Sequence, residues 1–333
     1  MEQARRLPPI VGEAPAFLEM LEHVSRAAAV SKPVLVIGER GTGKELISSR
    51  LHYLSPRWEQ PLVQVNCAAL TEGILESELF GHEAGAFTGA AARHRGHFER
   101  ATGGTLILDE LGTISLRMQE KILRVIEYGE FERVGGSETL SVDVRIVGAT
   151  NVDLKNLVQS GRFRPDLLDR LAFDVITLPP LRERLEDVLP LAYAFAVAIA
   201  AELKYPYFAG FSSRAASALL RHRWAGNVRE LKNAVERSVY RLDDPERKVT
   251  RIVFDPFDSP YRLQQDTRDP TKRAAAPAAA AADIGLPLDL KDEVAALETR
   301  LLRAALEKAK FNQRVAADLL GLSYHQLRGQ IRK

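Results

Sequence analysis

The sequence predicts an α/β fold, a parallel sheet flanked by helices, followed by a helical subdomain and a small C-terminal helical unit. Short apolar runs alternate with amphipathic stretches over residues 1–180, which is typical of a parallel sheet covered by helices. Strand-like runs then give way to helical periodicity over residues 181–250. The Pro- and Ala-rich segment 251–287 indicates a flexible linker before the last unit, 288–333.

Within the first unit, individual elements follow from apolar runs and helical periodicity. The expected strands are Val34–Ile37, Leu62–Val65, Leu106–Leu108 and Val142–Val147, and the expected helices include Gly43–Tyr53 and Leu116–Tyr128. In the helical subdomain, we expect interruptions at Pro190, at Gly210 and at Gly226–Asn227. Parallel strands bring their carboxyl ends to one edge of the sheet, where α/β folds bind ligands.

Composition and charge exclude several classes of protein. The chain of 333 residues is 46% apolar and 27% charged with a net charge of +2, so it is not polybasic as a whole. Cys67 is the only cysteine, which excludes an internal disulfide and is more typical of a small buried residue than of a reactive thiol. The N-terminus lacks a signal-peptide core, and Leu189–Leu203 is too short to cross a bilayer, so we expect a cytoplasmic protein without membrane insertion.

A phosphate-binding loop follows the first strand and opens a helix. Glycines let successive backbone N–H groups face phosphates, the helix N-terminus adds partial positive charge, and Lys44 reaches the terminal phosphates. The candidate ATP-binding residues are Gly38, Glu39, Arg40, Gly41, Thr42, Gly43, Lys44 and Glu45. Because Glu45 replaces the usual hydroxyl ligand of Mg²⁺, the metal must rely on an acid elsewhere.

Polar residues end three of the expected strands. In GTLILDE, Asp109 is the candidate Mg²⁺ ligand, and Glu110 is the candidate that orients and polarises the attacking water. With Lys44 they form the predicted catalytic centre. Asn66 and Asn151 each offer a neutral polar group suited to sensing a γ-phosphate or holding Glu110, and a strand-end cap is the alternative for each.

Three arginines are further candidates for the ATP site. Phosphoryl transfer often uses a guanidinium at the γ-phosphate, sometimes from a neighbouring molecule, and Arg164 and Arg170 lie around a helix that Pro165 suits at its first turn. Arg170 is four residues after Asp166, so a local salt bridge is its alternative role. Arg229 begins a helix of the second subdomain and is a candidate reporter of nucleotide state.

One Gly- and Ala-rich stretch fits neither helical nor strand periodicity. It consists of Gly85, Ala86, Phe87, Thr88, Gly89 and Ala90. Its glycines loosen the backbone around one large apolar side chain. Taken alone, the stretch fits either a surface turn with Phe87 folded onto the core or a mobile tip that contacts a partner.

The C-terminal residues predict a helix-turn-helix. A helix begins at Asn312 and ends at Gly321, and a second helix follows with Ser323 as its N-cap. Between Lys308 and Lys333 there are six Lys or Arg residues and one acidic residue, and this excess of positive charge suits phosphate contacts. The candidate DNA-binding residues are Ser323, Tyr324, His325, Gln326, Arg328, Gln330 and Arg332. A charged helical hairpin is the alternative.

A family resemblance covers residues 8–250 nearly continuously. In order, GERGTGKE, ELFGHEAGAFTGA, GGTLILDE, FERVGG, ATN, FRPDLLDRL, LPPLRER and GNVRELKN resemble the AAA+ ATPase domain of bacterial enhancer-binding proteins, the sigma-54-dependent transcription activators. GAFTGA is the most specific of these motifs, and the Glu after the phosphate-loop lysine is usual in this family. The tail resembles the Fis-type DNA-binding domain that closes most of its members. The resemblance therefore implies an AAA+ ATPase with a helical lid subdomain and a Fis-type helix-turn-helix.

The resemblance also implies roles for the residues above. Arg164 and Arg170 would act in trans on a neighbour's ATP, Asn66 would couple Glu110 to loop movement, and Arg229 would be the second nucleotide sensor. The active assembly would be a ring, usually a hexamer, and the DNA-binding domains would dimerise.

Contacts with sigma-54 follow from the same resemblance. The GAFTGA loop would project from the ring and touch sigma-54 during ATP hydrolysis, which favours the mobile tip over the buried turn. Residues 129–136, GEFERVGG, would form a supporting second loop, with Arg133 near the subunit boundary.

The implied partners are sigma-54 RNA polymerase, enhancer DNA and further copies of the chain. The ATPase begins almost at Met1, so we expect control by a separate repressor rather than by a receiver domain. Trp58 is a candidate docking point for that repressor, with a position folded onto the sheet edge as its alternative. The competing functions are a DNA-binding regulator whose ATPase only switches its oligomeric state, a different sigma-54 activator lacking a receiver domain, and an AAA+ replication factor, which would lack GAFTGA.

Overall fold

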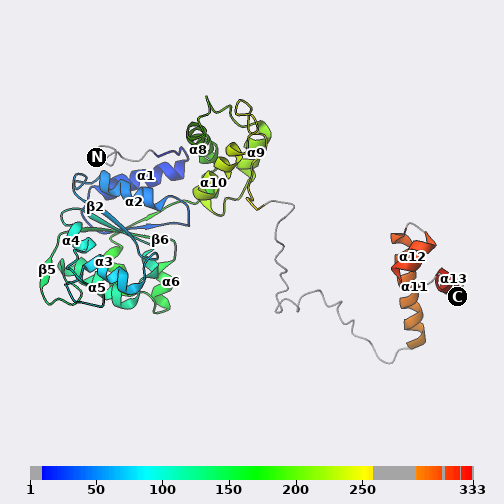
Figure 1. Ribbon diagram of the computed structural model, residues 1–333, viewed down its shortest axis with the longest axis horizontal. Coiled ribbons are helices and arrows are strands. Elements are labelled where there is room, and N and C mark those ends of the chain that lie inside the picture. The colour runs from blue at the N-terminus through cyan, green and yellow to red at the C-terminus, as the bar shows by residue number, and fades with distance from the viewer. Residues whose placement is uncertain (1–9, 258–289, 310–311, 323, 332–333) are drawn as a thin grey trace. The chain divides into compact units, whose positions relative to one another are not determined.

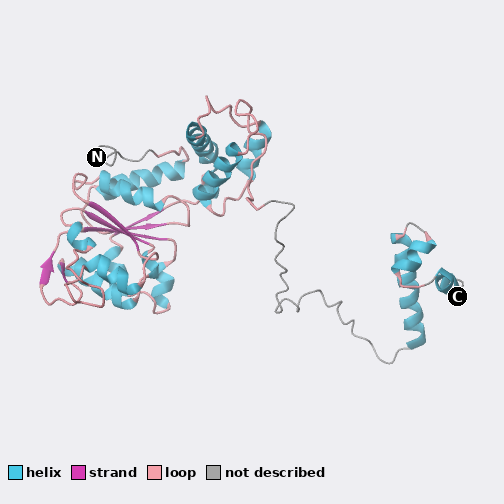
Figure 2. Cartoon of the chain, in the orientation of Figure 1, coloured by secondary structure: helices cyan, strands magenta, loops and turns pink. Residues whose placement is uncertain are grey.

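A five-stranded parallel sheet lies at the centre of the first part of the chain. Its strands are β1 (Val34–Ile37), β2 (Leu62–Asn66), β3 (Thr105–Asp109), β6 (Arg145–Thr150) and β7 (Asp174–Thr177), in the order β2-β3-β6-β1-β7 (Figure 2). All four strand pairs are parallel, so the carboxyl ends of the strands share one edge. The computed structural model describes residues 10–257, 290–309, 312–322 and 324–331, and it divides into one compact unit up to Asp258 and another from Ser259.

Helices cover both faces of this sheet (Figure 1). One face carries α1 (Pro15–Ala28) and α2 (Lys44–Tyr53); the other carries α3 (Glu72–Phe80), α4 (His97–Arg100), α5 (Leu116–Tyr128), α6 (Leu154–Gln159) and α7 (Pro165–Leu171). Leu106 and Leu108 pack in the core of the second face, whereas Ile107 packs in the core of the first. This alternation is what a strand buried on both faces requires. The predicted α/β fold is confirmed.

A helical lid follows the sheet. It contains α8 (Val188–Glu202), α9 (Ser213–Arg221) and α10 (Asn227–Tyr240), preceded by the short 3-10 helices η3 (Leu181–Glu183) and η4 (Leu185–Asp187). Fully buried Trp224 lies in the core of this lid, and Ile252 packs there too, so the lid continues past residue 250. The interruption expected at Pro190 is wrong: Pro190 lies in the first turn of α8, where its missing N–H has no intrahelical partner to lose.

The sheet differs from expectation in two places. Val142 lies outside β6, because its N–H donates to the Gly129 carbonyl and residues 142–144 lead in from the hairpin of β4 (Glu130–Glu132) and β5 (Thr139–Ser141). The edge strand β7 was not expected, because only two of its four residues are apolar, whereas the equally short β1 is an unbroken apolar run.

The second unit contains three helices among its described residues: α11 (Leu290–Lys308), α12 (Gln313–Leu319) and α13 (Tyr324–Ile331). The Asn312 side chain accepts hydrogen bonds from the N–H groups of Arg314 and Val315 and so caps α12, which begins one residue after the predicted start. A small core joins the helices and consists of Ala305, Ala309, Ala316, Ala317 and Leu327. Gln326 and Arg328 are exposed on α13. Ser323 and Arg332 lie outside the described residues, as do residues 258–287 of the predicted linker, and the side chains of Tyr324, His325 and Gln330 are not described.

In the part of the chain that the structure describes, none of the helices has both the length and the apolar character needed to cross a membrane.

Candidate functional site: an ATP site between the sheet and the lid

The phosphate loop connects β1 to α2. Gly43 adopts φ 104° as the N-cap of α2, a conformation that favours glycine. The Lys44 ammonium folds back over the loop and donates to the carbonyls of Gly38, at 2.9 Å, and Glu39, at 3.2 Å. Thr42 is buried and its hydroxyl also donates to the Glu39 carbonyl. The loop is therefore folded around its lysine, with the N-terminus of α2 open toward a phosphate.

Two carboxylates end the neighbouring part of the sheet. Glu110 has φ 53°, and its backbone N–H donates to Asp109 Oδ1 at 2.9 Å. Such a left-handed residue directly after a strand is uncommon for glutamate. Burial lowers the pKa of Lys44, whereas the charges of Glu110 and Asp109 raise it and that of Arg229 lowers it. These groups therefore lie close enough to act on one ammonium.

A cavity of about 800 Å³ opens beside these groups. Predicted site residues that line it are Arg40, Gly41, Thr42, Gly43, Lys44, Glu45, Asp109, Glu110 and Arg229. Apolar walls come from both the sheet domain and the lid, including Ile10, Val11, Leu191 and Phe195. A carboxylate oxygen is the ligand type that Mg²⁺ takes, so Asp109 beside the phosphate loop fits a metal bound with a nucleotide.

Asn66 and Asn151 lie at the same sheet edge but outside the described lining of this cavity. Asn66 is opposite Asp109 in the strand register, and its Oδ1 accepts from the backbone N–H of Ala68 at 2.9 Å. Asn151 is exposed directly after β6. The carbonyl of Thr150, its neighbour, accepts from Gly38 N–H, which joins this strand end to the phosphate loop. The sensing roles of both asparagines stay predictions.

The two candidate arginines around α7 are also outside the described lining of this cavity. Arg164 forms two hydrogen bonds with Asp166, at 3.0 and 2.7 Å. Arg170 donates to Glu127 at 2.9 Å, and 60% of its side chain is exposed. The alternative role considered for Arg170, a salt bridge with Asp166, is therefore wrong, because Arg164, at the N-cap of α7, binds that carboxylate.

The lid reaches the phosphate loop through residues that the sequence interpretation did not single out. Asn227 and Arg182 both bind the Glu39 carboxylate, and Arg184 donates to the Thr42 carbonyl at 3.1 Å. Burial lowers the pKa of Arg184, which is stacked over the ring of Phe17. The motifs LPPLRER and GNVREL contain these residues, but they carry no spacing signal for contacts with residues about 140 to 190 positions away.

The GAFTGA stretch forms a loop of turns between α3 and α4. Gly85 and Gly89 have φ values of 84° and 106°, and Gly85 N–H donates to the Ala90 carbonyl at 2.7 Å. Phe87 is 47% exposed, and its ring packs edge-on against His82 at a centroid distance of 4.9 Å. The phenylalanine thus rests on a neighbouring ring rather than in the core.

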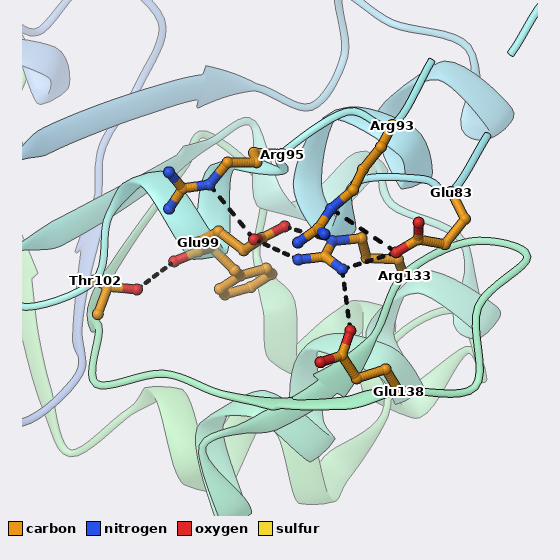
Figure 3. A network of polar contacts seen from close by, with 8 residues as sticks. Glu83, Arg93, Arg95, Glu99, Thr102, Arg133 and Glu138 are labelled. Carbon is orange, nitrogen blue, oxygen red and sulfur yellow. Dashed lines mark hydrogen bonds and ion pairs between the residues drawn. The ribbon is translucent and has the colours of Figure 1, made fainter. Parts of the chain in front are cut away.

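An arginine-centred ion-pair network joins this loop to the second loop, residues 129–136 (Figure 3). Arg133 donates to Glu99 at 2.9 and 2.7 Å and to Glu83 at 2.8 Å. These carboxylates raise the pKa of the Arg133 guanidinium. Only 2% of the Arg133 side chain is exposed, so its contacts lie within the chain, and its expected position near a subunit boundary stays a prediction. Gly135 packs so closely on Ala86 that a β-carbon there would lie 2.7 Å from Ala86 Cβ.

The structure also describes two other residues that the sequence analysis singled out, Trp58 and Cys67. Trp58 is 49% exposed in the turn after α2. Cys67 is buried, and burial raises its pKa to about 12, so it is a protonated packing residue rather than a reactive thiol.

Comparison with known proteins identifies the domains. Residues 10–177 match the sigma-54 interaction domain, residues 182–256 the AAA+ ATPase lid domain, and residues 293–333 the Fis family of bacterial regulatory proteins. The chain belongs to the sigma-54-dependent transcriptional activators. It is therefore an AAA+ ATPase with a DNA-binding helix-turn-helix.

Individual relatives agree with this assignment. The chain is 56% identical to the Psp operon transcriptional activator of Escherichia coli, over 97% of both chains. It is 45% identical to the Nif-specific regulatory protein of Azotobacter vinelandii, of which it spans 57%. NtrX from Brucella abortus has a similar solved structure, with a TM-score of 0.70 and 31% identity over 97% of this chain and 68% of NtrX. NtrX has also been solved in complex with ATP, with a TM-score of 0.69.

Proposed function

We propose that this activator hydrolyses ATP in a hexameric ring and thereby remodels closed complexes of sigma-54 RNA polymerase into open complexes. Its helix-turn-helix binds enhancer DNA upstream of the promoter, as a dimer, and the protein acts in the cytoplasm. The observation that carries the proposal is an exposed phenylalanine, Phe87, on a glycine-flanked loop that an ion-pair network joins to a second loop. An exposed aromatic side chain is the type of residue that anchors a protein contact.

We assign separate roles in ATP hydrolysis to the residues of this site. Lys44 holds the terminal phosphates, Asp109 holds Mg²⁺, and Glu110 orients the attacking water and accepts its proton. When bound, Mg²⁺ neutralises charge on the phosphates. Arg164 and Arg170, which do not line the cavity of their own chain and are partly exposed, serve the ATP of a neighbouring subunit. Asn66 and Asn151 report the state of the γ-phosphate from the same sheet edge.

Promoter opening in a purified system tests the central proposal. We expect Thr88→Ala to lose open-complex formation with sigma-54 RNA polymerase while hydrolysing ATP at the wild-type rate, because Thr88 is exposed on the loop and lies outside the ATP cavity. Thr71→Ala, at an exposed threonine outside both the contact loop and the ATP cavity, is the matched control and should open promoters normally. If the wild type hydrolyses ATP but opens no promoter, the regulator whose ATPase only switches its oligomeric state takes the place of this proposal.

We further propose that the chain activates the phage shock protein (psp) operon and is held inactive by the membrane-stress protein PspA. The similarity to the Psp operon activator supports the operon, and half-exposed Trp58 supports a docking point. Trp58→Ala is expected to make ATP hydrolysis insensitive to added PspA without changing its basal rate. Titration of PspA into an ATPase assay measures this, and undiminished inhibition of the variant would rule out Trp58 as the contact.

A further inference from the structure

Asn227 joins three separate segments of the chain. Its side-chain amide donates to Glu39 Oε2 and to the Arg40 carbonyl, both at 3.1 Å. Its Oδ1 accepts from the backbone N–H of Leu181 at 2.8 Å. These partners belong to the phosphate loop and to the start of the lid, whereas Asn227 begins α10. The residue is fully buried, so each of these three bonds replaces water that it cannot reach.

Glu39 is the second member of this arrangement. Arg182 donates to both of its carboxylate oxygens, at 2.7 and 2.8 Å. The hydrogen bonds from Arg182 and then Asn227 lower the pKa of Glu39 to about 2, so the carboxylate is charged at any physiological pH. Glu39 and Arg182 are each nearly half exposed, so this ion pair contributes little alone and can open.

The backbones of the phosphate loop and of the start of α10 lie so close together that no space remains for a side chain at Gly41. A β-carbon on Gly41 would lie 2.3 Å from the Gly226 carbonyl and 3.1 Å from Arg229 Cβ. The Arg229 N–H also donates to the Gly41 carbonyl at 3.3 Å. The first turn of α10 therefore lies directly on the phosphate loop, and Arg229 projects from this turn into the lining of the ATP cavity.

We propose that Asn227, Glu39 and Arg182 form a clasp that positions the first turn of α10, and with it Arg229, over the phosphate site and so sets the affinity for ATP. The three are positioning residues: they act through the placement of Arg229 and the phosphate loop. The amide of Asn227 carries most of the effect, because the residue is fully buried and one of its two donor bonds goes to the charged Glu39 carboxylate. The proposal concerns ATP binding alone and does not depend on the ring or on sigma-54.

Two single variants and their combination test the clasp in the full-length protein. Asn227→Asp removes the donor to Glu39 and places a second carboxylate against it, and aspartate tolerates the left-handed backbone at φ 52°. Glu39→Gln removes the charge that Arg182 and Asn227 share. In the double variant, the new amide at position 39 can donate to the new carboxylate at position 227, which restores a hydrogen bond with its direction reversed. Glu186→Gln, at an exposed glutamate of η4 outside the clasp, is the matched control.

The readout is the ATP dissociation constant from titration with a fluorescent ATP analogue, together with KM and kcat for hydrolysis. We expect Asn227→Asp to weaken ATP binding and raise KM by about tenfold, with a smaller change in kcat. Glu39→Gln should weaken binding less, and the double variant should bind more tightly than Asn227→Asp. Glu186→Gln should match the wild type.

Wild-type affinity in either single variant overturns the clasp. So does a double variant whose loss is the product of the two single losses, because independent effects mean that the residues do not act together. If Asn227→Asp does not fold, Glu39→Gln decides alone, since Glu39 is nearly half exposed and its replacement leaves the core intact.

Discussion

Glu110→Gln is expected to lower kcat for ATP hydrolysis by more than about a hundredfold while ATP binding stays close to that of the wild type. The amide keeps the size of the side chain and fits the same left-handed backbone at φ 53°. It cannot accept a proton, however, and it polarises water far less than a carboxylate. A loss confined to kcat is the signature of a group that acts only in the transition state. Steady-state hydrolysis together with nucleotide titration measures both quantities.

Two further variants serve as comparisons for Glu110→Gln. Glu19→Gln replaces an exposed glutamate of α1 and should leave both constants unchanged. Asp109→Asn should differ in kind from Glu110→Gln, because it removes the candidate metal ligand and so weakens the binding of Mg²⁺-ATP as well as hydrolysis. If Glu110→Gln kept the wild-type kcat, another group would have to activate the water, and the assignment of Glu110 would fail.

Much of the fold followed from local signals. The bounds of α5 are those expected, because Ser115 caps its first turn, accepting from Met118 N–H, and Gly129 ends it at φ 70°. The predicted bounds of α2 differ from the observed bounds by one residue, because Gly43 is the N-cap and the helix begins at Lys44. Likewise, parallel strands predicted a shared edge, and the structure brings Lys44, Asp109 and Glu110 to one cavity.

Contacts between segments that are far apart in the sequence could not be predicted from local sequence signals. Nothing in GNVREL indicates that Asn227 binds Glu39 in a loop 188 residues earlier. Arg133 shows the same limit, since its burial depends on carboxylates 34 and 50 residues away. Helical spacing offered a salt bridge with Asp166 as the alternative role of Arg170, yet the residue before the helix binds that carboxylate. Helical spacing rules predict contacts between residues of the same helix, and they do not consider residues outside that helix.

Arg145 is another residue whose role depends on tertiary structure. It begins β6 and is 1% exposed. Its guanidinium donates to the carbonyls of Ala27 and Ala28 at the end of α1, Leu51 in α2 and Lys32 before β1. The carbonyls at a helix C-terminus carry partial negative charge, which stabilises a buried cation. Burial lowers the pKa of Arg145 to about 10, so the group stays charged at neutral pH.

Arg145→Met is therefore expected to destabilise the first unit by about 3 kcal/mol, because four buried carbonyl contacts are lost while the apolar stem is kept. That corresponds to a fall in Tm of roughly 6 to 12 °C for a unit of this size. Scanning calorimetry without nucleotide measures the shift.

Arg214→Met replaces an exposed arginine of α9 and should change Tm little, whereas Arg145→Lys should lie between, because one ammonium cannot reach all four carbonyls. Methionine removes the cost of burying a charge, so a Tm equal to that of the wild type would mean that this cost balances the hydrogen bonds. The intermediate result for lysine distinguishes the two cases: if the carbonyl contacts dominate, retaining a cation restores part of the stability, and if burial of charge dominates, lysine is the least stable of the three.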